Sequence, residues 1–114
     1  MTYALVRNAA GRFVQPGEQS FQEAATTADW AHAQDFGLLM TNAPGEGAYP
    51  VTATTFVLMP RQPSDPRRGR LAADFFAWAL RDCQDTARAL GYVPVPPALV
   101  AQVEGYVASA IPGR

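Results

Sequence analysis

The pattern of hydrophobic and polar positions predicts a β-hairpin and a helix in the first thirty residues. Two short β-forming runs, 2–6 and 12–15, flank NAAG at residues 8–11, whose Asn and Gly tolerate positive φ in a hairpin turn. After Pro16 and Gly17 break this hairpin, apolar residues recur at helical spacing, at Phe21, Ala24, Ala25 and Ala28. We therefore expect strand, turn, strand and helix in that order.

The start of this helix has two interpretations. Ser20 and Glu23 match a capping box, but the helix could equally begin at Glu18, where a negative charge suits the helix dipole. Glu18 and Glu23 could also form an acid/base pair. Two carboxylates in a first turn are more typical of solvated dipole partners, so we favour that reading.

A second helix is predicted from Pro66 to Leu90. Asp65 is a good N-cap, Pro66 a good first residue, and Gly91 the expected residue after the end. Phe76 and Leu80 widen its apolar face. We expect this face to lie in the core, with Cys83 as an inert buried thiol; its central stripe consists of Leu71, Phe75, Trp78, Ala79, Cys83, Ala87 and Leu90.

The end of the chain predicts a connector and a last helix. GYVPVPP at residues 91–97 cannot continue a helix, because its three prolines lack amide donors. Pro97 can begin the helix PALVAQVEGYVASAI. One side of this helix is apolar, with Leu99, Val103, Tyr106 and Ala110 in line and Val100 and Val107 close by.

The run YPVTATTFVLMP at residues 49–60 predicts a strand. Alternation places Thr52 and Thr54 on one face and Thr55 on the other, which argues against a dedicated site of three hydroxyls. Both faces become apolar toward the end of the run. A strand buried on both sides is therefore expected.

Composition indicates one compact, soluble unit and excludes several function classes. The chain has 114 residues, 48% of them hydrophobic, and a net charge of −1, so no broad positive field exists to bind nucleic acid or an anionic membrane. All nine basic residues are arginine, which leaves no lysine for Schiff-base or P-loop chemistry. The single cysteine excludes an internal disulfide. Neither a signal peptide nor a membrane-spanning segment is predicted.

Few residues suggest a site. His32, between Asp29 and Asp35, has no serine or cysteine partner at a motif position, so a surface or half-buried structural histidine is favoured over a catalytic or ligand role. PGEG at residues 44–47 is loop chemistry rather than a P-loop. For the arginine cluster the default is a solvated face, and an anion or partner-protein site stays open; its members are Arg61, Arg67, Arg68 and Arg70. We expect no catalytic residue, metal site or cofactor.

Several runs carry a family resemblance. APGEGAYPVTATTFVLMP, FFAWAL at residues 75–80 and ALGYVPVPPALV at residues 89–100 resemble the C-terminal third of phosphate-binding proteins, the periplasmic receptors of phosphate ABC transporters. The opening YALVRNAAGRFVQPGEQSFQEAA is similar to the strand, turn and helix just upstream in that family. The resemblance covers essentially the whole chain, in the correct order.

The resemblance implies an α/β fold that is part of a type II periplasmic-binding protein. Residues 1–114 would form a single compact unit, with about 1–48 as the end of the second lobe and the crossover, and about 49–114 completing the first lobe. Residues 49–60 would be a strand near the hinge. Its polar start would face the cleft, which makes Tyr49, Thr52, Thr54 and Thr55 candidates for cleft or hinge residues.

The resemblance also implies what is missing. In the family, phosphate is held by backbone amides, hydroxyls, an arginine and an aspartate from upstream loops, and none of those positions exists here. We therefore expect a non-catalytic segment of a receptor in the periplasm or cell envelope, partnered by an ABC permease and binding phosphate only when completed. The alternative is a truncated paralogue that acts as an interaction or assembly module. Unpaired strand edges in a lone fragment predict a homodimer or domain swap.

Overall fold

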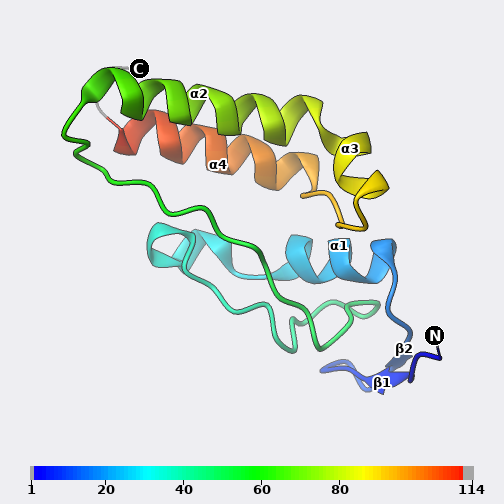
Figure 1. Ribbon diagram of the computed structural model, residues 1–114. Helices are drawn as coiled ribbons and strands as arrows, with labels where there is room; N and C mark the ends of the chain where they lie inside the picture. The colour runs from blue at the N-terminus through cyan, green and yellow to red at the C-terminus, as the bar shows by residue number, and fades with distance from the viewer. Residues whose placement is uncertain (1, 112–114) are drawn as a thin grey trace. The chain divides into compact units, whose positions relative to one another are not determined.

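The computed structural model describes residues 2–111 and divides the chain into two compact units. The N-terminal unit is Met1–Thr55 and the C-terminal unit is Phe56–Arg114. Within the described residues, the first unit contains a hairpin and one α-helix, whereas the second consists of helices and connecting segments (Figure 1). The result is a mixed chain compatible with a fragment of an α/β protein. The assignment of its parts to receptor lobes stays a prediction.

The predicted hairpin is confirmed, although its strands are shorter than expected. β1 (Val6–Arg7) pairs antiparallel with β2 (Phe13–Val14). Gly11 takes the predicted positive φ, 80°, but Asn8 does not. The backbone N–H of Asn8 donates to the carbonyl of Arg12 at 2.8 Å, which closes the turn without a left-handed residue at position 8.

Helix α1 (Glu18–Thr27) begins at the earlier of its two predicted starts. Gly17 is the N-cap, and Ser20 lies inside the first turn. The Ser20 hydroxyl accepts from the Gly17 N–H at 3.1 Å and donates to the Gln15 carbonyl at 2.9 Å. The capping box of Ser20 with Glu23 is therefore wrong, because Ser20 already serves the residues that precede the helix.

The core of the N-terminal unit is built from small side chains. Ala24 and Ala48 are fully buried, and Ala43 is 6% exposed, which brings α1 and the loop around residue 45 into close contact. The predicted apolar positions of α1 thus face the core. At the end of the helix the indole N–H of buried Trp30 donates to the Ala25 carbonyl at 2.6 Å.

Two short 3₁₀ turns follow α1, at Trp30–His32 and Gln34–Phe36. The ring of Trp30 lies against that of Phe36, with centroids 5.9 Å apart. Asp35 and Phe36 both have positive φ, 54° and 57°, so the chain reverses here without a glycine. These turns lead into a short apolar run at residues 36–40.

Helix α2 (Pro66–Asp82) begins where the sequence predicts. The Asp65 carboxylate accepts from the N–H groups of Arg67 and Arg68, at 2.9 and 3.3 Å, and Pro66 occupies the first turn. The first N–H groups of a helix lack carbonyl partners within it. Here the Asp65 carboxylate accepts from two of them, and Pro66 has no N–H that needs a partner.

The single helix predicted from Pro66 to Leu90 is wrong. The backbone leaves helical geometry at Cys83 (φ −104°, ψ 24°), and a separate short helix, α3 (Gln84–Ala89), follows. The side-chain amide of Gln84 donates to the Leu80 carbonyl, which a continuous helix would offer to the backbone N–H of Gln84. A local side-chain bond thus competes with helix continuation.

The C-terminal end of α3 is as predicted. Gly91 has φ 81° and donates its N–H to the Arg88 carbonyl at 3.0 Å, while the Tyr92 N–H donates to the Ala87 carbonyl at 2.9 Å. These two bonds form a Schellman motif, in which a glycine just past the helix takes the left-handed conformation.

Helix α4 (Pro97–Ala110) lies along α2, and their contact forms the core of the C-terminal unit (Figure 1). The predicted connector and helix start are confirmed. The predicted apolar side of α4 is at least half buried. The buried residues of the two helices are Ala73 and Ala77 on α2 and Leu99 and Val100 on α4.

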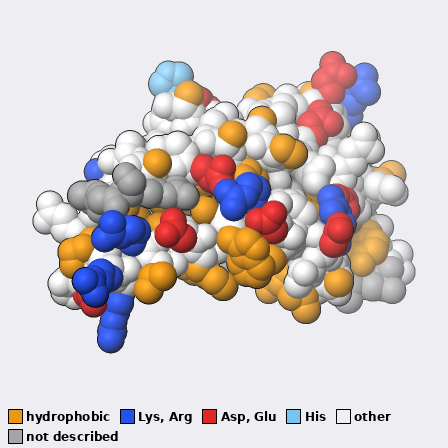
Figure 2. All heavy atoms as spheres, turned by 90° about the horizontal axis from the view of Figure 1, so that it is seen from above, with side chains coloured by type: hydrophobic (Ala, Val, Ile, Leu, Met, Phe, Trp, Pro, Cys, Tyr) orange, Lys and Arg blue, Asp and Glu red, His pale blue; other side chains and the backbone are white. Residues whose placement is uncertain are grey.

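The apolar stripe predicted for the core on α2 lies mostly outside it. Leu71, Phe75 and Trp78 are 70%, 55% and 48% exposed, and Leu90 beyond α3 is 70% exposed. Because each residue turns the helix by about 100°, this stripe lies on the far side from Ala73 and Ala77. The alanines permit the close approach to α4, and hydrophobic side chains remain on the surface between charged ones (Figure 2).

The strand predicted at residues 49–60 is not formed, and the expected burial on both sides is also wrong. Val51, Phe56, Val57 and Leu58 are 68%, 47%, 54% and 94% exposed. Within the described residues, 51–60 make no backbone hydrogen bond. A strand needs a neighbouring strand for its ladder, and the only sheet described here is the hairpin.

Candidate functional site

Long-range side-chain hydrogen bonds of the N-terminal unit gather at the loop of residues 44–47. Their centre is Asn8, which is 5% exposed. The Asn8 side-chain N–H₂ group donates to the carbonyls of Gly45, Glu46 and Ala48, at 3.3, 2.8 and 3.1 Å. A single buried amide therefore ties the hairpin turn to a loop about forty residues later.

Two side chains of α1 hold the same loop from its other side. One carboxylate oxygen of Glu23 accepts from the Gly47 N–H at 2.6 Å, and the Thr27 hydroxyl accepts from the Gly45 N–H at 3.2 Å. Side chains at either glycine would meet these groups, since a Cβ at Gly47 would collide with the Glu23 carboxylate. Glycine at both positions lets the loop backbone approach these side chains closely.

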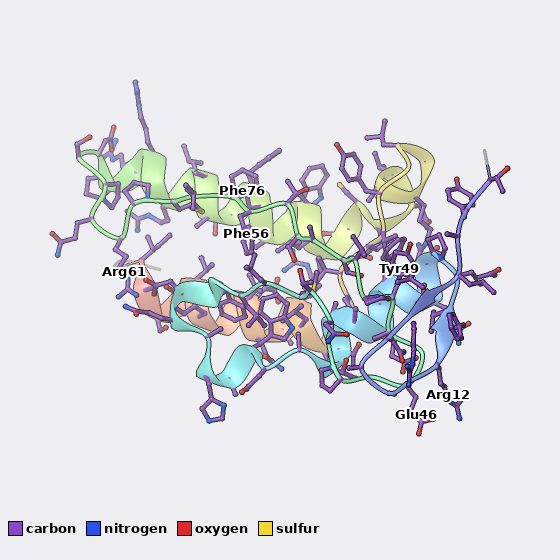
Figure 3. All side chains as sticks on the ribbon, turned by 90° about the horizontal axis from the view of Figure 1, so that it is seen from below. Arg12, Glu46, Tyr49, Phe56, Arg61 and Phe76 are labelled. Carbon is purple, nitrogen blue, oxygen red and sulfur yellow. The ribbon has the colours of Figure 1, made fainter. Side chains whose placement is uncertain are left out.

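An exposed ion pair also joins the hairpin to this loop. Arg12 and Glu46 point toward each other, with a guanidinium nitrogen 3.2 Å from a carboxylate oxygen (Figure 3). Both side chains are largely exposed, so the pair adds little stability. The predicted loop is confirmed, but sequence reasoning missed its anchors, because Asn8 was read as a turn residue and Glu23 as a cap.

The four candidate cleft or hinge residues lie immediately after this loop. Tyr49 packs its ring edge-on against Phe21, 5.5 Å between centroids, and accepts a hydrogen bond from the Thr52 hydroxyl at 2.6 Å on its backbone carbonyl. Thr52 is 7% exposed. The Thr54 hydroxyl is shielded from solvent without a hydrogen-bond partner, whereas Thr55 is exposed.

The four candidate residues differ in their partners and in their exposure. The Thr52 hydroxyl is bonded to the backbone carbonyl of Tyr49, and Thr54 is less exposed than Thr55. Their role at a cleft or hinge stays a prediction.

His32 lies on the surface. Its Nδ1 is 2.8 Å from a carboxylate oxygen of Asp29, and both side chains are largely exposed. His32 is therefore a surface histidine, one of the two positions that the sequence favours for it.

The arginine cluster is spread over several local partners. Arg68 Nε is 3.6 Å from the Asp65 carboxylate, and Arg61 reaches the hydroxyl of Tyr106 at 3.2 Å, with its guanidinium carbon 6.0 Å from the ring centroid. These contacts lie at the start of α2 and on α4. Within residues 2–111, no group of three metal-ligating side chains comes together.

Glu18 and Glu23 do not form an acid/base pair. Glu18 accepts from the side-chain amide of Gln22 at 3.3 Å, and Glu23 binds the Gly47 N–H. Glu18 lies in the first turn of α1, as a dipole partner should. Glu23 instead has a structural role that the sequence did not indicate. In the described part of the chain, no helix is long and apolar enough to cross a bilayer.

Comparison with known proteins gives these residues a family context. No protein-family model matches the chain. The phosphate-binding protein PstS of Xylella fastidiosa strain Temecula1 is 51% identical over 109 residues, which cover 96% of this chain. Over this length the chain is similar to a segment of phosphate-binding proteins. The PstS proteins of Pasteurella multocida and Haemophilus influenzae are each 36% identical over 104 residues.

The resemblance seen in the sequence is thus confirmed, and so is its partial extent. The aligned residues cover 30% of the length of the Xylella protein, 30% of the Pasteurella protein and 31% of the Haemophilus protein. The chain therefore spans about a third of the length of these curated relatives, in agreement with the expected size of the segment.

Proposed function

We propose that the chain is a non-catalytic segment of a phosphate-binding receptor of an ABC importer, with a scaffold and hinge role. The observation that carries the proposal is the 51% identity over 109 residues to a phosphate-binding protein. Such a receptor works in the periplasm or cell envelope with an ABC permease. The type II periplasmic-binding fold and its division into two lobes are part of this proposal.

The local chemistry supports a scaffold rather than a phosphate site. Several polar side chains are already engaged: Asn8 and Glu23 bind loop backbone, and Thr52 binds the Tyr49 carbonyl. Arg61 binds Tyr106. We therefore infer that the phosphate ligands come from the part of the receptor that this chain does not match.

Titration calorimetry on the isolated chain tests the missing ligands. Inorganic phosphate should give no heat beyond dilution. Sulfate serves as the control anion, because a weak, non-selective arginine site would respond to both. Selective binding of phosphate at about micromolar Kd, or about −8 kcal/mol, would contradict the proposal.

A chimera tests the receptor role directly. The 109 matched residues of the Xylella protein are replaced by those of this chain, and phosphate binding is compared with that of the unaltered Xylella protein. We expect a Kd within roughly tenfold, about 1.4 kcal/mol, because the ligands remain in the unaltered part. A folded chimera that binds no phosphate would favour the alternative, an interaction or assembly module without phosphate binding.

A further inference from the structure

Helix α2 is apolar almost all round between Leu71 and Leu80. In this stretch, LAADFFAWAL, Asp74 is the single residue that is not apolar. A helix that is apolar on every side belongs between two layers, because each apolar face needs a neighbour that excludes water. The sequence of α2 therefore requires packing partners on more than one side.

Helix α4 supplies one of these partners. The side of α2 that meets α4 carries the buried Ala73 and Ala77, and both helices belong to the C-terminal unit. Arg81, one turn after Ala77, reaches the carboxylate of Glu104 on α4 at 3.2 Å. The packing of α4 therefore uses the alanine side of α2.

Leu71, Phe75 and Trp78 form an apolar stripe on the side of α2 that is turned away from α4. Their spacing of four and three residues keeps them within one narrow arc, at about 100° per residue. The ring centroids of Phe75 and Trp78 lie 5.8 Å apart, so the two rings form one surface. One turn before and one turn after the stripe, the same arc carries Arg68 and Asp82. The uncharged stripe is thus about two turns long, roughly 10 Å.

The rest of a receptor is large enough to supply the second partner. The C-terminal unit, residues 56–114, is small, and a domain of about 60 residues buries only about 60% of its unfolded surface. In the part of the chain that the structure describes, no large side chain is fully buried. The matched residues are 30% of the length of the Xylella protein, so most of such a receptor lies outside the matched stretch.

We propose that the stripe of Leu71, Phe75 and Trp78 is the surface on which the unmatched part of the receptor docks; this rests on the proposed receptor function. The docked face is apolar and uncharged over about two helical turns, to match the stripe. It also offers one hydrogen-bond acceptor, because a buried indole N–H such as that of Trp78 needs a partner. Helix α2 then lies between α4 and this face.

Hydroxyl-radical footprinting, read by mass spectrometry, tests the docking at Trp78. The isolated chain is compared with the chimera in which this chain replaces the matched residues of the Xylella protein. Trp78 is 48% exposed and should be oxidised readily in the isolated chain. In the chimera the oxidation rate should fall about fivefold or more, because core side chains keep less than about a tenth of their exposed area. Trp30, 8% exposed, is the matched control and should react slowly in both proteins.

The outcomes separate the docking proposal from the receptor proposal. A chimera that binds phosphate but oxidises Trp78 as fast as the isolated chain would overturn the docking and leave the receptor role intact. A chimera that protects Trp78 but binds no phosphate would do the reverse, and one that does not fold would contradict both.

Protection of Trp78 already in the isolated chain would also overturn the docking proposal. Dilution then identifies what covers the stripe. Protection by a second copy of the chain is lost on dilution, whereas protection by the N-terminal unit is not.

A charge placed in the stripe gives a second readout. In the chimera, Phe75→Asp should return the oxidation rate of Trp78 to within about twofold of that in the isolated chain, because docking would bury an unpaired carboxylate. Phe75→Leu keeps the position apolar and should leave Trp78 protected. In the isolated chain both variants should keep the helical circular dichroism, since Phe75 is 55% exposed. Full protection of Trp78 in the Phe75→Asp chimera would place the docked face elsewhere.

Discussion

The two units of this chain are stabilised in different ways. In the N-terminal unit, polar side chains make the long-range contacts: Asn8 and Glu23 bind the backbone of one loop from two directions, over a core of alanines. In the C-terminal unit, α2 packs against α4 through Ala77 and Leu99 among other buried residues. Hydrogen-bond geometry specifies the first unit, and apolar helix packing specifies the second.

The comparison shows that size and hydrophobicity do not identify the residues that hold this chain together. Three large apolar side chains of α2, those of Leu71, Phe75 and Trp78, are about half exposed or more, while alanines and one asparagine are buried. Substitutions in the two units should therefore have effects that the residue type alone does not predict.

The largest effect is expected in the helix pair. Leu99→Ala removes a side chain that is 8% exposed and should lower the free energy of unfolding of the C-terminal unit by about 3 kcal/mol. Leu71→Ala is the matched control, since Leu71 is 70% exposed, and should cost less than about 0.5 kcal/mol. Urea unfolding followed by helical circular dichroism measures both. Equal losses of stability for the two variants would contradict the exposed position of Leu71.

A smaller loss is expected at the polar anchor of the N-terminal unit. Asn8→Ala leaves three carbonyls without their donor and should cost about 2 kcal/mol, because buried unpaired groups carry a desolvation penalty. Hydrogen exchange should report it as faster exchange of the Arg12 and Gly47 amides, with that of α4 unchanged. Faster exchange throughout both units would contradict the expectation that Asn8 stabilises only the N-terminal unit.

The smallest effects should have opposite signs in the two units. Gly47→Ala forces the Glu23 carboxylate away and should destabilise the N-terminal unit by about 1 kcal/mol. Gly105→Ala lies within α4, where no atom lies within 4 Å of the new Cβ, and should stabilise the C-terminal unit by about 0.5 to 1 kcal/mol. Thermal unfolding of both variants measures the two changes in stability. A stabilising effect of Gly47→Ala would contradict the close approach of Gly47 to Glu23.

Local signals predicted the element ends well. Asp65 and Pro66 begin α2, Gly91 ends α3, and Pro97 begins α4, as the sequence indicates. Each of these features acts within one helical turn, so its chemistry is complete in a short stretch of sequence. No glycine or proline near Cys83 indicates the break there, which coincides with one side-chain bond of Gln84.

Features that depend on distant partners were predicted poorly. The stripe through Phe75 and Trp78 has helical spacing, but periodicity cannot tell which of two apolar faces meets a neighbour, and the alanine face does. The run 49–60 has strand composition but no adjacent strand here. The anchoring roles of Asn8 and Glu23 join residues far apart in sequence, so no local pattern indicates them.

By itself, the sequence determined the starts of α2 and α4, the end of α3, the hairpin turn, and the kinship with phosphate-binding proteins, because caps, turns and family likeness depend on neighbouring residues. The tertiary structure alone decided which face of α2 is buried, that Asn8 and Glu23 hold the loop, and that residues 51–59 remain unpaired. Burial and pairing are properties of two surfaces meeting. A single stretch of sequence specifies only one of the two.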